Sequence, residues 1–272
     1  MFRSAQMLLM HTLLKHHSIA VDSMDRRFVD LLLDFTDDDN DKAPSTYSVL
    51  NMCLTGERYF HYSTGSFLGP YMASLIIKQV CLSASSVEKP SIEVMSLCHG
   101  AGGLRPSDIE RLSSKEGDGI LILVSSKLGI GDSIEDDVIA QQEIVTLLES
   151  KHCVGILGGP KGRSCYIIDA SAADSILSAL DPHVLLEAPN VRPDIFPSNQ
   201  YMQELTAVDP SIHTKIKVEE MDPCFAVGFY LSNPKEEFMP WRESLKTYTY
   251  FSLPMEPAGL DGEDEDGGFL LV

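Results

Sequence analysis

Apolar residues in the first third of the chain recur at a helical spacing. Met7, Met10, Leu13 and Leu14 fall on one face of a helix expected over residues 3–17. The pattern also predicts helices over three further segments, residues 26–35, 47–55 and 71–83. The stretch 63–70, between the last two, is rich in turn-forming residues and predicts a loop.

The pattern changes in the second half, where apolar runs become short and are bounded by Gly, Asp or Pro. Such runs are typical of β-strands, and they cover residues 92–98, 119–124, 153–157, 164–168, 176–180 and 225–231. Helices are expected over residues 138–150, 198–207 and 235–245. Early helices, late strands and tight hairpin spacing within 153–180 predict an α+β domain with a mainly antiparallel sheet.

The composition fits an ordinary soluble globular protein, since 44% of residues are hydrophobic and 22% are charged. No apolar run approaches the roughly 20 residues that span a bilayer, and the first residues lack the features of a signal peptide. The cysteines are scattered without a C-x-x-C pair, which favours reduced thiols in the cytoplasm over a structural zinc site. They are Cys53, Cys81, Cys98, Cys153, Cys165 and Cys224.

The net charge is strongly negative, −19 from 21 Lys and Arg against 40 Asp and Glu. It argues against sequence-independent nucleic-acid binding, which depends on neutralising phosphates, and favours a partner with a basic face. The acidic run at residues 37–41 has two interpretations, a calcium loop and a solvated turn. Because it lacks the EF-hand spacing, we expect no metal, and nothing in the chain predicts a cofactor.

Asp181 and His183, separated by Pro182, carry the first chemical signal. Positions i and i+2 of an extended strand project to the same face, and Pro182 favours extended geometry at the residue before it. The carboxylate could then orient the imidazole and stabilise the imidazolium of an ionised cysteine–histidine pair. A surface turn is the alternative, because a three-residue motif is not specific.

The surrounding segments favour the catalytic interpretation. Residues 155–161 (Gly-Ile-Leu-Gly-Gly-Pro-Lys) form a strand end, a double glycine and a loop, and residues 222–229 end in a Gly-Phe strand. Together with Leu-Asp-Pro-His at 180–183, they resemble the autophagins, papain-like cysteine peptidases that process the ubiquitin-like modifiers of autophagy. Other segments also resemble this family, in chain order, namely residues 1–7, 63–70 and 127–130, so that the resemblance spans residues 1 to about 245.

The resemblance implies a papain-like core with a small helical subdomain over residues 1–254. It implies cleavage after the C-terminal glycine of the modifier, and release of the modifier from phosphatidylethanolamine. By position, His183 would be the general base and Asp181 its orienting carboxylate. Phe67, which replaces the family's tryptophan, would line or gate the channel for the glycine tail together with Gly158 and Gly159. The implied partner is the modifier, free and lipid-conjugated, and we expect a monomer.

The chain departs from the family pattern at the nucleophile, which would fall just before Met1. The first helix also lacks a capping residue ahead of it, which both truncation and a frayed terminal helix would explain. Cys165 stands where the family has a histidine. It could replace the nucleophile, but a cysteine within a strand lacks the helix N-terminus that stabilises a thiolate. We therefore expect a buried structural thiol, and no cleavage of a modifier precursor by this chain.

Residues 255–272 predict a flexible acidic tail. Its end, Phe269 to Val272, resembles the aromatic-x-x-aliphatic motifs that bind autophagy modifiers by adding a strand to a sheet edge. A disordered solubilising tail is the alternative. For the whole chain, two alternatives to the peptidase stay open, a non-catalytic modifier-binding protein and an unrelated α+β protein with chance matches.

Overall fold

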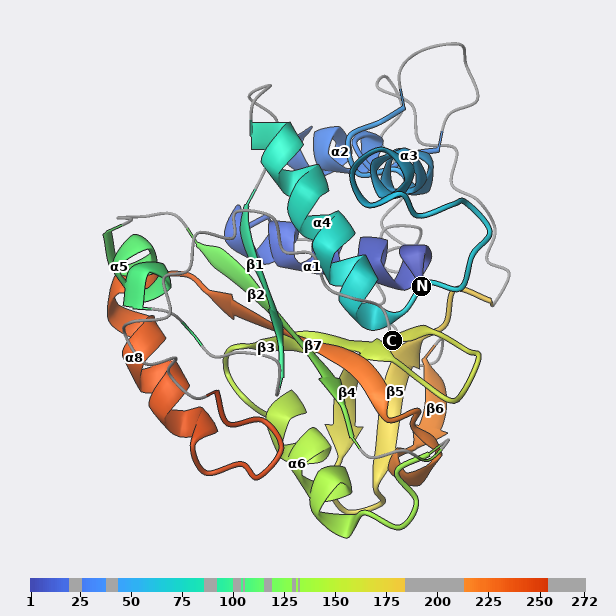
Figure 1. The fold of residues 1–272 in the computed structure, drawn as a ribbon, viewed down its shortest axis with the longest axis vertical. Helices are drawn as coiled ribbons and strands as arrows, with labels where there is room; N and C mark the ends of the chain where they lie inside the picture. The colour runs from blue at the N-terminus through green and yellow to red at the C-terminus, as the bar shows by residue number, and fades with distance from the viewer. Residues whose placement is uncertain are drawn as a thin grey trace.

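A computed structural model describes residues 1–19, 26–37, 44–85, 92–99, 104, 106–114, 119–128, 131, 133–183 and 213–253. A central sheet carries helices on both faces (Figure 1). In chain order the elements are α1 (Phe2–His16), α2 (Arg26–Leu33), α3 (Val49–Phe60), α4 (Pro70–Ser85), β1 (Glu93–Cys98), α5 (Pro106–Ser114), β2 (Ile120–Lys127), α6 (Val138–Leu148), β3 (Cys153–Gly158), β4 (Cys165–Ser171), β5 (Ile176–Leu180), β6 (Thr214–Lys217), η2 (Val218–Glu220), β7 (Cys224–Leu231) and α8 (Pro234–Leu245).

The seven strands lie in the order β1-β2-β7-β3-β4-β5-β6. Only β1 and β2 are parallel, and every other pair of neighbours is antiparallel. The predicted α+β fold with a mainly antiparallel sheet is therefore confirmed. Three described elements were not predicted, α5, β6 and η2, because each carries too few apolar residues to show a period.

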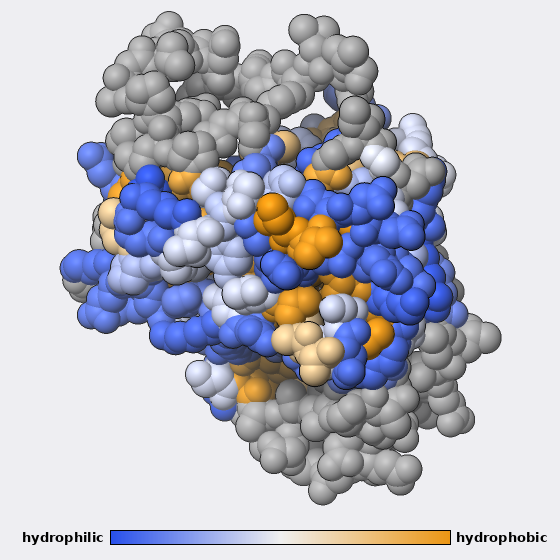
Figure 2. Space-filling view, turned by 90° about the horizontal axis from the view of Figure 1, so that it is seen from below, coloured by the Kyte–Doolittle hydropathy of each residue, from blue (hydrophilic) through white to orange (hydrophobic). Residues whose placement is uncertain are grey.

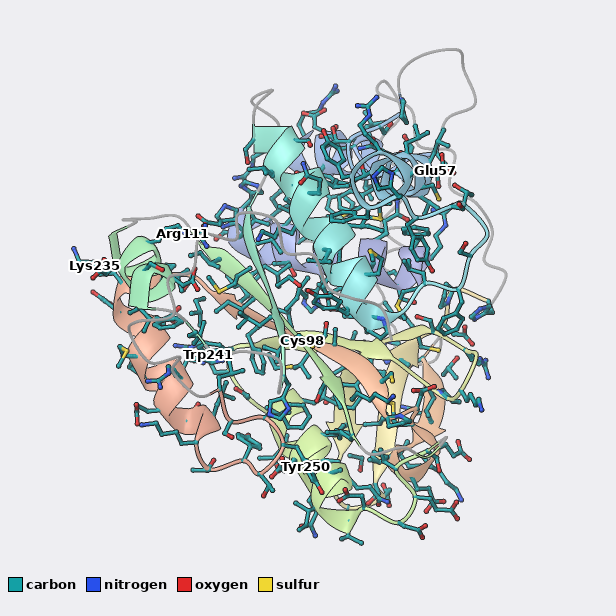
Figure 3. The ribbon with its side chains drawn as sticks, in the orientation of Figure 1. Glu57, Cys98, Arg111, Lys235, Trp241 and Tyr250 are labelled. Carbon is teal, nitrogen blue, oxygen red and sulfur yellow. The ribbon has the colours of Figure 1, made fainter. Side chains whose placement is uncertain are left out.

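Both faces of the sheet are buried, which explains the unbroken apolar run of β2. Ile120, Ile122 and Val124 belong to the core shared with α6 and α8. Leu121 and Leu123 project to the opposite face and join the core shared with α1, α3 and α4. Figure 3 shows Trp241 between α8 and the sheet, far from Glu57 on α3.

Helix α1 lies between the sheet and the other early helices, so even its polar residues Ser4, Gln6 and Thr12 are buried. The side-chain amide of Gln6 donates to the carbonyls of Phe35 and Tyr47, both at 2.9 Å. These bonds tie α1 to the segments that follow α2 and precede α3. The predicted first helix is present, and it belongs to the core.

The end of the molecule that contains α6 is mainly hydrophilic, with small apolar patches near its middle (Figure 2). Val138 and Ile139, at the start of α6, remain 61% and 51% exposed. No described helix combines the length and the apolar character needed to cross a membrane. The helix predicted over 198–207, most of the acidic run at 37–41 and the tail with Phe269 and Val272 lie outside the described residues.

Candidate active site

Asp181 and His183 are in direct contact immediately after β5. The imidazole Nδ1 of His183 lies 2.7 Å from Oδ1 of Asp181, and the backbone N–H of His183 donates to the same oxygen at 2.9 Å. Because an ionised carboxylate only accepts hydrogen bonds, Nδ1 carries the proton. The other ring nitrogen, Nε2, is then left as the base.

The local geometry that brings the pair together differs from the prediction. Strand β5 ends at Leu180, and residues 182 and 183 form a turn rather than continuing an extended strand. Pro182 cannot donate to the sheet, and the Asp181 carboxylate takes the next free N–H in a local side-chain-to-backbone turn. The expected extended geometry was therefore wrong, although the predicted contact is present.

A third residue completes the surroundings of the carboxylate. Oδ2 of Asp181 accepts a short hydrogen bond from the guanidinium of Arg163, and the Asp181 side chain is fully buried. Burial raises the pKa of Asp181, but the bonds from His183, the bond from Arg163 and the Arg163 charge outweigh it and lower the pKa below its ordinary value. The carboxylate is therefore held ionised beside the imidazole.

Cys165 lies next to this group at the start of β4, where Tyr166 pairs with Leu180 of β5. Its side chain is fully buried. Burial and the neighbouring Asp181 carboxylate raise the pKa of the thiol to about 11, so it is protonated at neutral pH. The prediction of a buried thiol is confirmed, although Cys165 opens its strand rather than standing in its middle.

His183 opens onto a pocket of about 740 Å³. Phe67, Gly158 and Gly159 line the pocket together with His183, while Asp181 is buried behind its wall. The pocket is bounded by the start of α1, the loop before α4, the ends of β1 and β2, the β3–β4 loop and the start of β7. Figure 3 shows Cys98 at this end of β1.

The β3–β4 loop has a shape that requires glycine. Gly159 has φ +144°, and a Cβ there would collide with the carbonyl oxygen of Arg163. The loop is also fastened at its base, since the Asp222 N–H donates to the Gly159 carbonyl at 2.8 Å. The fold therefore places a backbone position that requires glycine in the lining of the same pocket as His183.

Two histidines of the first helix have structural contacts. His11 and His16 contact the hydroxyls of Tyr166 and Tyr230, at 2.6 and 3.1 Å. Among the residues described, no group of three or more His, Cys, Asp or Glu side chains is arranged to hold a metal ion. Sequence reasoning missed Arg163, because its partner lies 18 residues away and no local pattern marks the contact.

Comparisons with known proteins agree with this geometry. The profile of the peptidase C54 catalytic domain matches residues 1–244. The probable cysteine protease ATG4 of Candida glabrata is 28% identical over 253 residues, covering 90% of this chain and 47% of that protein. The cysteine protease ATG4a of Arabidopsis thaliana is 25% identical over 264 residues, covering 88% of this chain and 52% of that protein.

The chain thus spans about half the length of these curated relatives. The profile match runs from α1, through Asp181 and His183, into α8. A match of this extent removes the alternative of an unrelated protein with chance similarities, and the chain belongs to the autophagin family, the peptidase C54 family.

Proposed function

We propose that residues 1–254 form the larger part of the catalytic domain of a cytoplasmic, monomeric cysteine endopeptidase of autophagy. Its substrate is a ubiquitin-like modifier, which it cuts after the C-terminal glycine and releases from phosphatidylethanolamine. The observation that carries the proposal is the Asp181–His183 contact beside a pocket that the start of α1 also lines. The names of the relatives, cysteine proteases, support it.

The proposed nucleophile is a cysteine immediately before Met1. Met1 is the N-cap of α1 and lines the same pocket as His183. A thiol there would lie at a helix N-terminus, where the dipole and free N–H groups stabilise a thiolate. His183 would take the thiol proton and pass it to the leaving amine, and water would then hydrolyse the acyl-enzyme. Asp181 would orient the ring and stabilise the imidazolium.

The glycine specificity has a steric explanation in this proposal. Gly158 and Gly159 line one side of the pocket and Phe67 another. A Cβ at Gly158 would lie 2.9 Å from Cβ of Phe225, so this wall is tightly packed. We expect the glycine tail of the modifier to bind against these residues, where any Cβ on the tail would clash.

The proposal is tested by adding Gly-Trp-Gly-Cys directly before Met1 and measuring cleavage of a modifier precursor. We expect glycine-specific cleavage by this form, and none by the matched Gly-Trp-Gly-Ser form or by the 272-residue chain. If the cysteine form is folded and binds the precursor but does not cleave it, the proposal is wrong. Cleavage by the 272-residue chain that Cys165→Ala abolishes would instead identify Cys165 as the nucleophile.

The second candidate is a non-catalytic protein that binds the modifier through the pocket and the tail. It is favoured by the state of Cys165, the thiol nearest Asp181, whose raised pKa of about 11 opposes a nucleophilic role. Under this candidate the 272-residue chain binds the modifier without cleaving it. Substituting Phe269 and Val272 by alanine would weaken that binding if the tail contributes, and would leave it unchanged if the tail only solubilises the protein.

A further inference from the structure

The two oxygens of the Asp181 carboxylate have different partners. Oδ1 accepts both hydrogen bonds from His183, from the backbone N–H at 2.9 Å and from Nδ1 at 2.7 Å. Oδ2 accepts a hydrogen bond from the guanidinium of Arg163. Each oxygen is therefore assigned to one neighbour, and the plane of the carboxylate is fixed by contacts at both ends.

We propose that Arg163 is a positioning residue of the candidate active site, which holds Asp181 ionised and oriented so that His183 keeps its base, Nε2, toward the pocket. This inference deepens the proposed function and rests on it for the role of His183. It concerns a residue that does not contact the reacting atoms and acts only through Asp181.

The burial of Asp181 explains why such a partner is needed. Its side chain has no exposed surface, and an ionised carboxylate in that position is costly unless its oxygens are paired. His183 pairs one oxygen only. The other neighbour is the thiol of Cys165, which burial and Asp181 itself keep protonated and which is at best a weak donor.

The position of Arg163 suits this role. Its own side chain is 48% exposed, so its charge remains partly hydrated and costs little to hold near the carboxylate. Its backbone N–H donates to the Pro160 carbonyl at 2.9 Å, inside the loop that Asp222 fastens at Gly159. The side chain therefore extends from a constrained backbone, and it links the glycine loop to the Asp181–His183 pair.

Lysine would not reproduce this contact fully. The guanidinium is planar and holds its donors in a fixed plane, whereas the ammonium of lysine is a flexible, strongly hydrated point charge. An Arg163→Lys variant should therefore keep part of the electrostatic effect on Asp181 and lose most of the orientation. Comparing Arg163→Met with Arg163→Lys therefore separates the effect of the positive charge on Asp181 from the effect of the hydrogen-bond geometry.

The inference is tested in the 272-residue chain by NMR, with no substrate and no catalysis. Aspartate carrying ¹³C at the carboxyl is incorporated, the Asp181 signal is assigned with Asp181→Asn, and its titration midpoint is measured. We expect Arg163→Met to move the midpoint to higher pH, because it removes a hydrogen bond and a positive charge that lower the pKa of Asp181. Arg163→Lys should move it less.

The matched control is Lys217→Met, which removes the cation of an exposed ion pair between Lys217, at the end of β6, and Glu219 in η2 and should leave the Asp181 midpoint unchanged. An equal midpoint in wild type and in folded Arg163→Met would overturn the inference. The ¹⁵N shifts of His183 give a second readout, and we expect Arg163→Met to reduce the population protonated at Nδ1 alone. An unchanged tautomer would equally count against positioning.

In the form carrying the added cysteine, Arg163→Met should lower kcat by roughly ten- to a hundredfold, on the scale that misplacement of a reacting group costs, while KM changes little. A fall in kcat/KM through KM alone would show a binding role instead. Failure of the cysteine form to cleave would sink the proposed function, but the titration of Asp181 would still decide the role of Arg163.

Discussion

Two parts of the pocket lining, the His183 wall and the Phe67 wall, differ in how closely their atoms are paired and packed. On the His183 wall, polar groups are paired, since both Asp181 oxygens are bound and the glycine loop is fastened through Asp222. The second wall is the loop before α4, which also lines the pocket and carries Phe67, a residue that is 84% exposed. A Cβ added to Gly65 or Gly69 in that loop would meet nothing within 4 Å.

The difference suggests that the two walls have different functions. Proton transfer needs groups held within a fraction of an ångström, which dense pairing provides. Capture of a chain end tolerates adjustment, and an open apolar wall can adapt to it. If this view is correct, substitutions on the His183 wall should affect chemistry and stability strongly, and those on the Phe67 wall should affect binding alone.

The largest expected effect is on the chemical step. In the form with Gly-Trp-Gly-Cys before Met1, His183→Ala should reduce kcat/KM by about a thousandfold, within the range for loss of a general base. His213→Ala, a histidine just before the edge strand β6, is the matched control and should have little effect. If both variants lose the same amount of activity, the effect is not specific to His183, and the prediction is wrong.

A smaller effect, on stability, compares two glycines that both line the pocket. Gly159→Ala forces a side chain onto φ +144° and against the Arg163 carbonyl, so it should lower the free energy of unfolding by about 1–3 kcal/mol. Gly69→Ala has open space and no positive φ, and should change it by less than about 0.5 kcal/mol. Urea unfolding of both variants measures the difference. Similar changes in the free energy of unfolding would mean that the two walls tolerate an added side chain equally well.

The features that could be predicted from the sequence are those that a short local pattern of residues indicates. The apolar run over residues 119–124 indicated the strand β2, and the Asp-Pro-His spacing indicated a contact that the structure contains. The turn that makes this contact was not predicted, because a proline is compatible with both an extended strand and a turn. The order of segments was enough to recognise the family.

Long-range contacts account for what was missed. Arg163 meets Asp181 only after β4 pairs with β5, and a lone arginine in a glycine-rich loop carries no period or motif. Helix α3 extends to Phe60, beyond its predicted end, because Gly56 faces Ile76 of α4, where a Cβ would lie 3.2 Å away. The predicted helix ends just before Gly56, but in the fold this glycine lies inside α3 and allows close contact with α4.

The smallest stability effect is expected at Phe67, and its control lies in the same pocket. Phe67 is 84% exposed, whereas Phe225, at the start of β7, is fully buried. Phe67→Ala should change the free energy of unfolding by less than about 0.5 kcal/mol, while Phe225→Ala should lower it by about 3–5 kcal/mol. In the form carrying the added cysteine, Phe67→Ala should raise KM and leave kcat nearly unchanged, because an exposed ring contributes to binding and not to the proton transfer. A fall in kcat at constant KM would place Phe67 with the chemical wall, and would remove the contrast between the two sides of the pocket.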